Sequence, residues 1–137
     1  MVKPGELDWC CTWAPQVRRF IARGSGGVFA FTTSGNVTRF DNELGSPYPS
    51  PNGQLWAFES TGDFNPGAPG VRLYSPDGTL LRELTSEPVF DVLWRPDSAG
   101  SFFAATTGMY FVAMPDGQPI HVDGARAFDL GWVGGTD

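Results

Sequence analysis

A short motif near residue 90 returns close to the end of the chain, and this repeat constrains the fold more than any other feature. The run FDVLW at 90–94 recurs as FDLGW at 128–132. The interval is about 38 residues, and a period near 40 with strand-like content is typical of stacked β units, most often propeller blades. The repeat therefore predicts an architecture. It says less about function, because propellers are scaffolds whose activity lies in loops and rims.

Three prolines mark the same period along the rest of the chain. Pro15, Pro51 and Pro96 lie at matching places, which gives periods of about 36 and 45 residues. The longer middle unit contains an insertion at 61–70. We therefore predict an N-terminal tail and three blades, followed by the inner strand of a further blade with a C-terminal tail. Their ranges are 1–8, 9–44, 45–88, 89–127 and 128–137.

Each unit divides into four short strands separated by turn residues. The turns SPDG at 75–78 and PDG at 115–117 combine a Pro, which fixes φ, with a Gly, which tolerates positive φ. No segment shows a convincing apolar period of 3.6 residues, so we expect an all-β fold. The predicted strands are 9–13, 18–22, 28–32 and 37–40, then 46–49, 54–60, 71–75 and 79–85, then 89–94, 101–106, 109–114 and 119–122.

The first strands of the units carry their large apolar side chains at alternate positions. Phe90, Val92 and Trp94 follow this spacing, and so do the first, third and fifth residues of WCCTW at 9–13. A period of two places each trio on one face of a strand, where it can pack against the neighbouring sheet. The second unit has SPYP at 46–49 instead. Proline removes ladder donors, so we expect an edge strand there, as the inner strand of a blade is.

The second unit carries a family resemblance. It reads SPNGQLWAFES at 50–60, GVRLYSPDG at 70–78 and LT at 84–85. This order resembles the TolB-like branch of WD40-like (PD40-type) β-propeller repeats; the third unit matches moderately and the first weakly. The resemblance implies tandem four-stranded antiparallel blades around a central axis, with the Trp/Phe strands innermost. It implies no catalytic residues, since the motif carries none.

Three blades and one inner strand make an incomplete ring, because a closed propeller has about 4–8 blades. An open array leaves unpaired strand edges and apolar faces, which favour association. We therefore expect a protein partner, or self-association, to complete the propeller.

Charge and hydropathy narrow the classes of partner and compartment. The net charge is −6, which argues against nucleic acid or an anionic membrane surface as the main partner. No apolar run approaches the ~20 residues that a membrane helix needs. The first residues also lack the apolar core of a signal peptide, so we expect a cytoplasmic protein.

The insertion in the second unit is the best candidate for a partner contact. Asp63 and Asn65 offer oxygens at alternate positions, and Phe64 lies between them. A calcium loop would also need a third alternating ligand and a bidentate Glu downstream. We predict a long connection with Phe64 contacting a protein partner, because interaction residues concentrate on loops.

A basic cluster at Arg18, Arg19 and Arg23 is the second candidate. A solvated strand face explains it most simply, and an acidic partner site is the alternative. The chain has no G-x-S-x-G elbow and no phosphate loop, and its single histidine is His121. We expect no catalytic, cofactor or metal residues.

These patterns favour a non-catalytic propeller module that acts as a protein-interaction scaffold within a larger or oligomeric propeller. Two alternatives stay open. One is an accessory propeller of a larger enzyme, such as a serine peptidase. The other is a ligand-sensing propeller, which would need polar groups converging from the inner strands.

Overall fold

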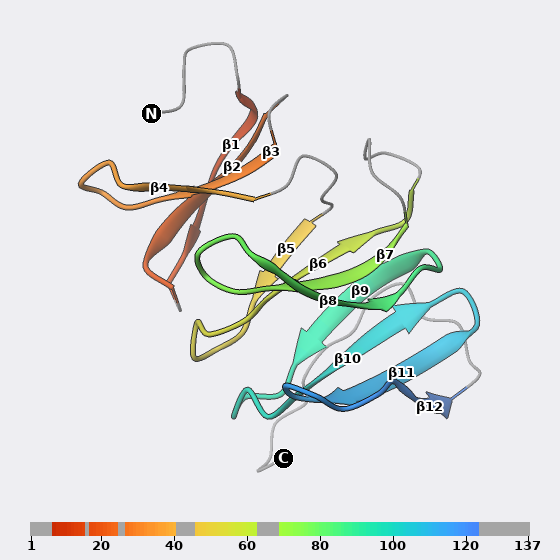
Figure 1. Cartoon of the computed structure of the whole chain (residues 1–137). Coiled ribbons are helices and arrows are strands. Elements are labelled where there is room, and N and C mark those ends of the chain that lie inside the picture. Colours follow the sequence, from red (N-terminus) through yellow and green to blue (C-terminus); the bar gives the residue numbers. More distant parts are fainter. Residues whose placement is uncertain (1–6, 16, 25–26, 41–45, 63–68, 124–137) are drawn as a thin grey trace.

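Three four-stranded antiparallel sheets make up the described part of the chain (Figure 1). The computed structural model describes residues 7–15, 17–24, 27–40, 46–62 and 69–123. Within these ranges every regular element is a strand. The sequence prediction of an all-β chain with three four-stranded units is confirmed. The predicted strand at 128–132 lies outside the described residues.

Each sheet is a simple up-and-down meander, because its strands pair in chain order. We call the sheets blade 1, blade 2 and blade 3. Blade 1 contains β1 (Leu7–Ala14), β2 (Arg19–Gly24), β3 (Gly27–Phe31) and β4 (Val37–Arg39). Blade 2 contains β5 (Ser46–Pro49), β6 (Trp56–Ser60), β7 (Gly70–Tyr74) and β8 (Leu80–Thr85). Blade 3 contains β9 (Val89–Trp94), β10 (Gly100–Ala105), β11 (Gly108–Ala113) and β12 (Ile120–Asp123). The first strand begins at Leu7, inside the predicted tail 1–8.

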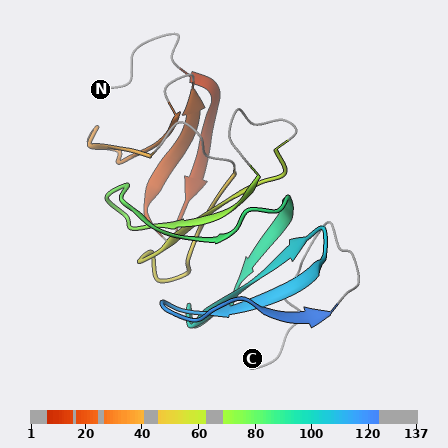
Figure 2. The same ribbon diagram turned by 45° about the vertical axis from the view of Figure 1, so that its right-hand side comes forward.

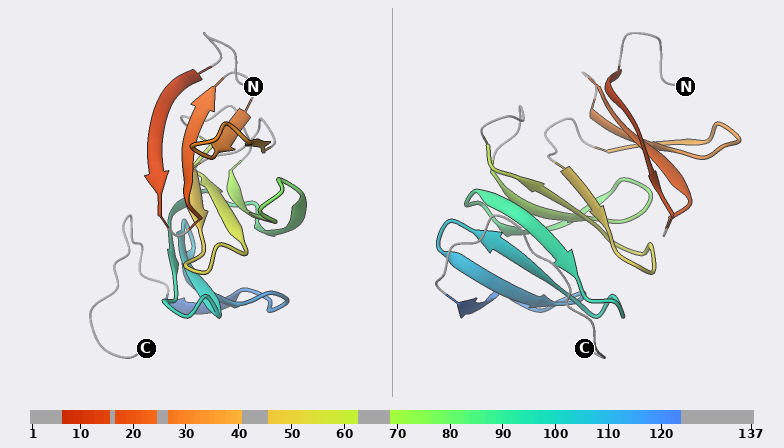
Figure 3. Two further views of the ribbon diagram at one scale, coloured as in Figure 1. Left: turned by 90° about the vertical axis from the view of Figure 1, so that its left-hand side faces the viewer. Right: turned by 180° about the vertical axis from the view of Figure 1, so that it is seen from behind.

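The blades follow one another in space as they do in sequence. Blade 2 lies between blades 1 and 3 in every view (Figures 1, 2 and 3). Blade 1 and blade 3 therefore each have one face toward blade 2 and one outward face. The described sheets form an open arc, which agrees with the expected incomplete ring.

The seam between blades 2 and 3 is mainly aliphatic. Side chains from β6, β7 and β8 meet side chains from β9, β10 and β11 there, and burial of each large one contributes about 1.5–3 kcal/mol. The buried residues of this cluster are Ala57, Val71, Leu73, Leu84, Val89, Val92, Trp94, Phe103, Ala105 and Val112.

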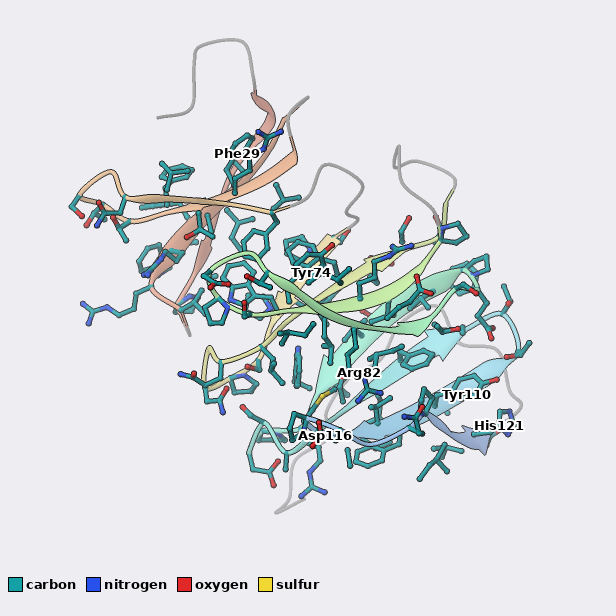
Figure 4. All side chains as sticks on the ribbon, in the orientation of Figure 1. Phe29, Tyr74, Arg82, Tyr110, Asp116 and His121 are labelled. Atoms are coloured by element: carbon teal, nitrogen blue, oxygen red, sulfur yellow. The ribbon has the colours of Figure 1, made fainter. Side chains whose placement is uncertain are left out.

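The seam between blades 1 and 2 is aromatic. Phe40, which follows β4, packs with its ring centroid 4.9 Å from Trp56 and 5.0 Å from Phe58. Tyr74 meets Phe40 edge-on at 5.9 Å, and Figure 4 shows it on the side of blade 2 that faces blade 1. Edge-to-face and tilted pairs at these separations are the favoured geometries of aromatic rings. Four rings from two blades thus form one core.

A β-bulge changes the predicted face of β9. Ala105 pairs with Val89 and Ala104 pairs with Asp91, which leaves Phe90 as the extra residue. Val89 is fully buried beside Val92 and Trp94, whereas Phe90 is half-buried. The predicted trio of Phe90, Val92 and Trp94 is therefore wrong at its first member, because the bulge moves Val89 onto the core face.

The proline-containing strand takes the position predicted for it. β5 is an edge strand of blade 2 and pairs only with β6, where Pro47 lies opposite Phe58 and Pro49 opposite Trp56. An edge position accepts proline because one side of the strand needs no ladder donors.

Aspartates close two turns, one of them the predicted turn at 75–78, by binding their own backbone. The Asp77 carboxylate accepts from the Thr79 amide at 3.1 Å and from the Ser75 hydroxyl. The Asp97 carboxylate accepts from the Ala99 amide at 2.9 Å. The hydrogen bond from the Ser75 hydroxyl holds the pKa of Asp77 below its usual value, and the Ala99 amide does the same for Asp97.

Candidate functional site

The first strands of all three blades line one hollow on the inner side of the arc. Its volume is about 370 Å³, and its walls come from β1, β5, β9 and the residues beside them. The lining residues are Trp13, Ala14, Ile21, Pro47, Tyr48, Pro49, Pro51, Val92, Leu93 and Trp94. Among these described residues there is no carboxylate, guanidinium, ammonium or imidazole. The inner hollow therefore suits an apolar or aromatic group and offers little to acid–base chemistry.

One hydrogen bond fixes two walls of this hollow to each other. The Trp94 indole Nε1 donates to the Tyr48 carbonyl at 2.7 Å and so links β9 to β5. It joins the first strands of two blades, each of which pairs on one side only within its own sheet. Trp94 thus anchors the inner edge of blade 3 to blade 2.

A second, more polar hollow of about 220 Å³ lies at the seam of blades 1 and 2. Arg19 and Trp56 both line it, from β2 and β6. Arg19 Nη1 donates to the Val17 carbonyl at 3.0 Å and to the Arg18 carbonyl at 3.3 Å. The remaining lining residues are Val17, Ala30, Asn52, Gly53, Gln54 and Pro76. We call this space the seam hollow.

The predicted site residues do not form one cluster in the described structure. Arg19 lines the seam hollow, while its neighbour Arg18 is exposed and has a left-handed backbone with φ 53°. Asp63, Phe64 and Asn65 lie outside the described residues, so their predicted role as a partner contact stays a prediction.

An apolar row crosses the outward face of blade 1. Trp13 pairs with Phe20, Phe20 with Phe31, and Phe31 with Val37, one residue from each strand. Ring centroids are 4.8 Å apart for Trp13 and Phe20, and 5.8 Å apart for Phe20 and Phe31. On the opposite face of the blade, Ala14, Ile21 and Ala30 pack into the core shared with blade 2. Because side chains alternate, the Trp13 row points outward.

Blade 3 has a matching row on its own outward face. Leu93 pairs with Phe102, Phe102 with Phe111, and Phe111 with Ile120. The rings of Phe102 and Phe111 lie 4.9 Å apart, and Ile120 is 62% exposed. The neighbouring side chains Phe103 and Val112 pack toward blade 2, so this row also points outward.

The sequence predicts apolar faces at the ends of an open array, but of the two outward rows only Trp13 lies on a strand face that it singles out. The other strands of both blades carry a signal for the same faces. The strands β2, β3, β10 and β11 carry apolar residues on both of their faces. A strand with a single buried face needs them on that face alone. A strand that is apolar on both faces indicates a second packing surface.

A carboxylate ties the start of blade 3 to its own β10–β11 turn. Glu87 accepts at 2.9 Å from the Thr106 hydroxyl and from the backbone amide of Thr107. Partial burial raises the pKa of Glu87, but these hydrogen bonds outweigh it and hold the pKa below its usual value. His121 lies on the exposed outer strand, with Nε2 3.3 Å from the Thr107 carbonyl and its ring edge-on to Tyr110 (Figure 4). Glu87 thus holds the segment before β9 against the β10–β11 turn, and His121 holds the outer strand β12 against the same turn.

The described residues include neither a metal-binding cluster nor a membrane-spanning helix. No group of three or more His, Cys, Asp or Glu side chains there is arranged to hold a metal ion. No helix in the described ranges is long and apolar enough to cross a bilayer.

Comparison with solved structures identifies the architecture. A protein assigned as TolB from Agrobacterium tumefaciens superposes with a TM-score of 0.57 at 18% identity, over 85% of this chain and 46% of that chain. The fold is that of β-propeller blades. A form of Kluyveromyces lactis Hsv2 with loop 6CD replaced by a Gly-Ser linker gives a TM-score of 0.55 at 16% identity, over 75% of this chain and 36% of that one.

These likenesses extend to the fold alone. This chain spans less than half the length of either protein. No family model matches the sequence, and no curated protein does.

Proposed function

We propose that this chain is a non-catalytic, PD40-type propeller module that acts as a protein-interaction scaffold, with its two outward faces taking further blades. The observation that carries the proposal is the pair of outward apolar rows on blades 1 and 3. Each row crosses all four strands of its blade. A contiguous apolar row of this kind is typical of an interface.

The inner seams indicate how the outward faces would be covered. At each seam, one face of a blade packs against the opposite face of the next blade. The outward faces of blades 3 and 1 stand in the same relation, so the end of one copy is suited to the start of another. Such head-to-tail contacts are heterologous, and they close into a ring if the rotation per copy permits.

A mixing experiment with two charged variants tests this arrangement. Trp13→Glu places a charge on the row of blade 1 and Ile120→Glu on the row of blade 3; both side chains are exposed, at 44% and 62%. We expect each variant to associate more weakly than the wild type in sedimentation velocity. The two variants mixed should form a heterodimer, since each keeps the face that the other lacks.

Leu80→Glu is the matched control, because Leu80 is 53% exposed but belongs to the middle blade. It should leave association unchanged. Association of Trp13→Glu and Ile120→Glu equal to that of the wild type would contradict the proposal. Circular dichroism of all three variants checks that they keep the β fold.

The inner hollow supports a second candidate, a ligand-sensing propeller. Its apolar walls, with Trp13, Tyr48 and Trp94, would take a flat apolar ligand. Thermal unfolding in the presence of an indole or naphthalene probe tests this. A raised melting temperature that Trp94→Ala removes would favour it, and an unchanged melting temperature would count against it.

A further inference from the structure

Trp56, which lines the seam hollow, carries a buried hydrogen-bond donor with no acceptor among the described residues. Trp56 is 2% exposed, and within the described structure its indole Nε1 has no hydrogen-bond partner. An unpaired buried donor costs about 1–3 kcal/mol, and such groups are rare in folded proteins. By contrast, the indole of Trp94 is satisfied by the Tyr48 carbonyl. An acceptor that reached the Trp56 indole from the hollow would remove this cost.

Arg19 also lines this hollow, and none of its contacts to the described residues is to a carboxylate. Within that part of the chain, Arg19 donates through Nη1 to two neutral carbonyls. Among the described residues, ion pairs join Arg72 to Glu83 and Arg95 to Asp97, and neither pair involves Arg19. A guanidinium carries five donors in a planar fork, so several donors of Arg19 remain for a ligand.

The size and charge of the hollow select the kind of anion. A space of about 220 Å³ at the seam takes a small group rather than a whole molecule. One guanidinium and one indole N–H give full compensation to a single negative charge. The net charge of the chain is −6, which disfavours a dianion such as phosphate. A planar guanidinium also matches a planar carboxylate in a bidentate manner.

We propose that the seam hollow binds one carboxylate group of a protein partner. Arg19 supplies the charge-assisted hydrogen bonds, and Trp56 Nε1 donates to an oxygen of the same group. The Asn52 and Gln54 side chains are exposed at the hollow and contact the part of the partner that carries the carboxylate. This site is separate from the outward faces, so its test does not depend on assembly of the blades.

The experiment follows the Trp56 indole resonance by 15N–1H NMR while sodium acetate is added, with sodium chloride at equal ionic strength as the reference. We expect a saturable shift with acetate alone. Two peptides then distinguish the source of the carboxylate. One is N-acetyl-Ala-Glu-Ala-amide, which has only a side-chain carboxylate, and the other is N-acetyl-Ala-Ala-Ala, which has only a C-terminal one. The peptide that shifts Trp56 at the lower concentration names the source.

Variants show whether binding is specific to the hollow. Arg19→Gln should weaken acetate binding about tenfold, as expected when a charge-assisted bond is lost. Arg18→Gln is the matched control: it removes the same charge from the adjacent, exposed side chain, and binding should change less than twofold if the hollow itself is the site. Trp56→Phe, followed through the Arg19 side-chain resonances, should also weaken binding. The proposal is overturned if acetate and chloride act alike, or if Arg18→Gln and Arg19→Gln weaken binding equally.

Discussion

The two seams of this molecule join similar blades by different means. The seam of blades 2 and 3 combines an aliphatic core with side-chain hydrogen bonds that cross it. The Trp94 indole donates to the Tyr48 carbonyl, and the backbone amide of Asn52 donates to the Ser98 hydroxyl at 3.0 Å. Arg82 donates to the carbonyls of Pro115 and Gly117 at 2.8 and 2.6 Å, and Figure 4 shows it close to the turn that carries Asp116.

The seam of blades 1 and 2 relies on its aromatic core. Phe40 and three rings of blade 2 fill it, and the donor that faces this seam, Trp56 Nε1, has no partner in the described structure. Hydrogen bonds across the seam of blades 2 and 3 fix its geometry, and the hollow of about 220 Å³ lies at the seam of blades 1 and 2. The fixed seam therefore suits the scaffold, whereas the seam with the unpaired Trp56 donor is the place to look for a ligand.

The largest expected effect comes from filling the tight approach between blades 1 and 2. A Cβ on Gly78 would lie 2.6 Å from the Arg39 carbonyl oxygen, and φ is +92°. We expect Gly78→Ala to lower the free energy of unfolding by about 2–4 kcal/mol, from overpacking and backbone strain together. Gly35→Ala is the control, since Gly35 has φ +95° with nothing within 4 Å of its Cβ. Urea denaturation should show about 1 kcal/mol for the control, and equal losses would contradict the contact.

A pair of Trp→Phe substitutions compares the two seams directly. Trp94→Phe removes the donor to the Tyr48 carbonyl and should cost about 1 kcal/mol beyond the change in volume. Trp56→Phe removes an unpaired donor and so relieves the cost of burying it. We therefore expect Trp56→Phe to lower the free energy of unfolding by about 2 kcal/mol less than Trp94→Phe does. The difference in free energy of unfolding between the two variants is the measured quantity. A larger loss for Trp56→Phe would show that its indole is bonded after all.

Removing the hydrogen bonds from Arg82 to the β11–β12 turn of blade 3 should have a moderate effect on stability. Arg82→Gln loses both carbonyl contacts and should lower the stability by about 1–2 kcal/mol. Arg95→Gln, which loses an exposed pair with Asp97, should cost less than about 1 kcal/mol. Hydrogen exchange of the β11–β12 amides should accelerate in the first variant only. Equal exchange in both variants would mean that Arg82 does not hold the turn.

The smallest expected effect is a dependence of stability on pH through Glu87. Its folded pKa lies below its usual value of 4.5. The stability it contributes is therefore complete above pH 4.5 and is lost as the pH falls through the folded pKa. We expect at most about 1 kcal/mol, because solvent screens this half-exposed group. Thermal melts between pH 3 and 6 should show a weaker pH slope for Glu87→Gln; identical slopes would contradict the tie to Thr106 and Thr107.

Most of the fold could be predicted from the repeated turns in the sequence. Pro51 and Pro96, with Gly78 and Gly117, mark where chain direction reverses, and turn chemistry of this kind is local. Strand order then follows, because short turns force neighbouring strands to pair antiparallel. The edge position of β5 was also predictable, since Pro47 and Pro49 cannot serve a central strand.

The site was less predictable because it depends on how separate blades meet. The bulge at Phe90 arises because its neighbours Asp91 and Val89 pair with Ala104 and Ala105. No local sequence pattern shows this pairing. The unpaired state of Trp56 depends on what surrounds its indole in the folded chain. The charge of Arg19 makes it a candidate in the sequence, but only the structure places it at one hollow with Trp56.

The most direct test of the central claim is the absolute mass of the chain in solution by light scattering, over a concentration series. We predict a mass that rises from the monomer value of 14.8 kDa to a defined multiple of it, because the outward rows of blades 1 and 3 cover each other. A constant mass of one chain at the highest concentration would contradict the account, since it would show that these faces need no further blade.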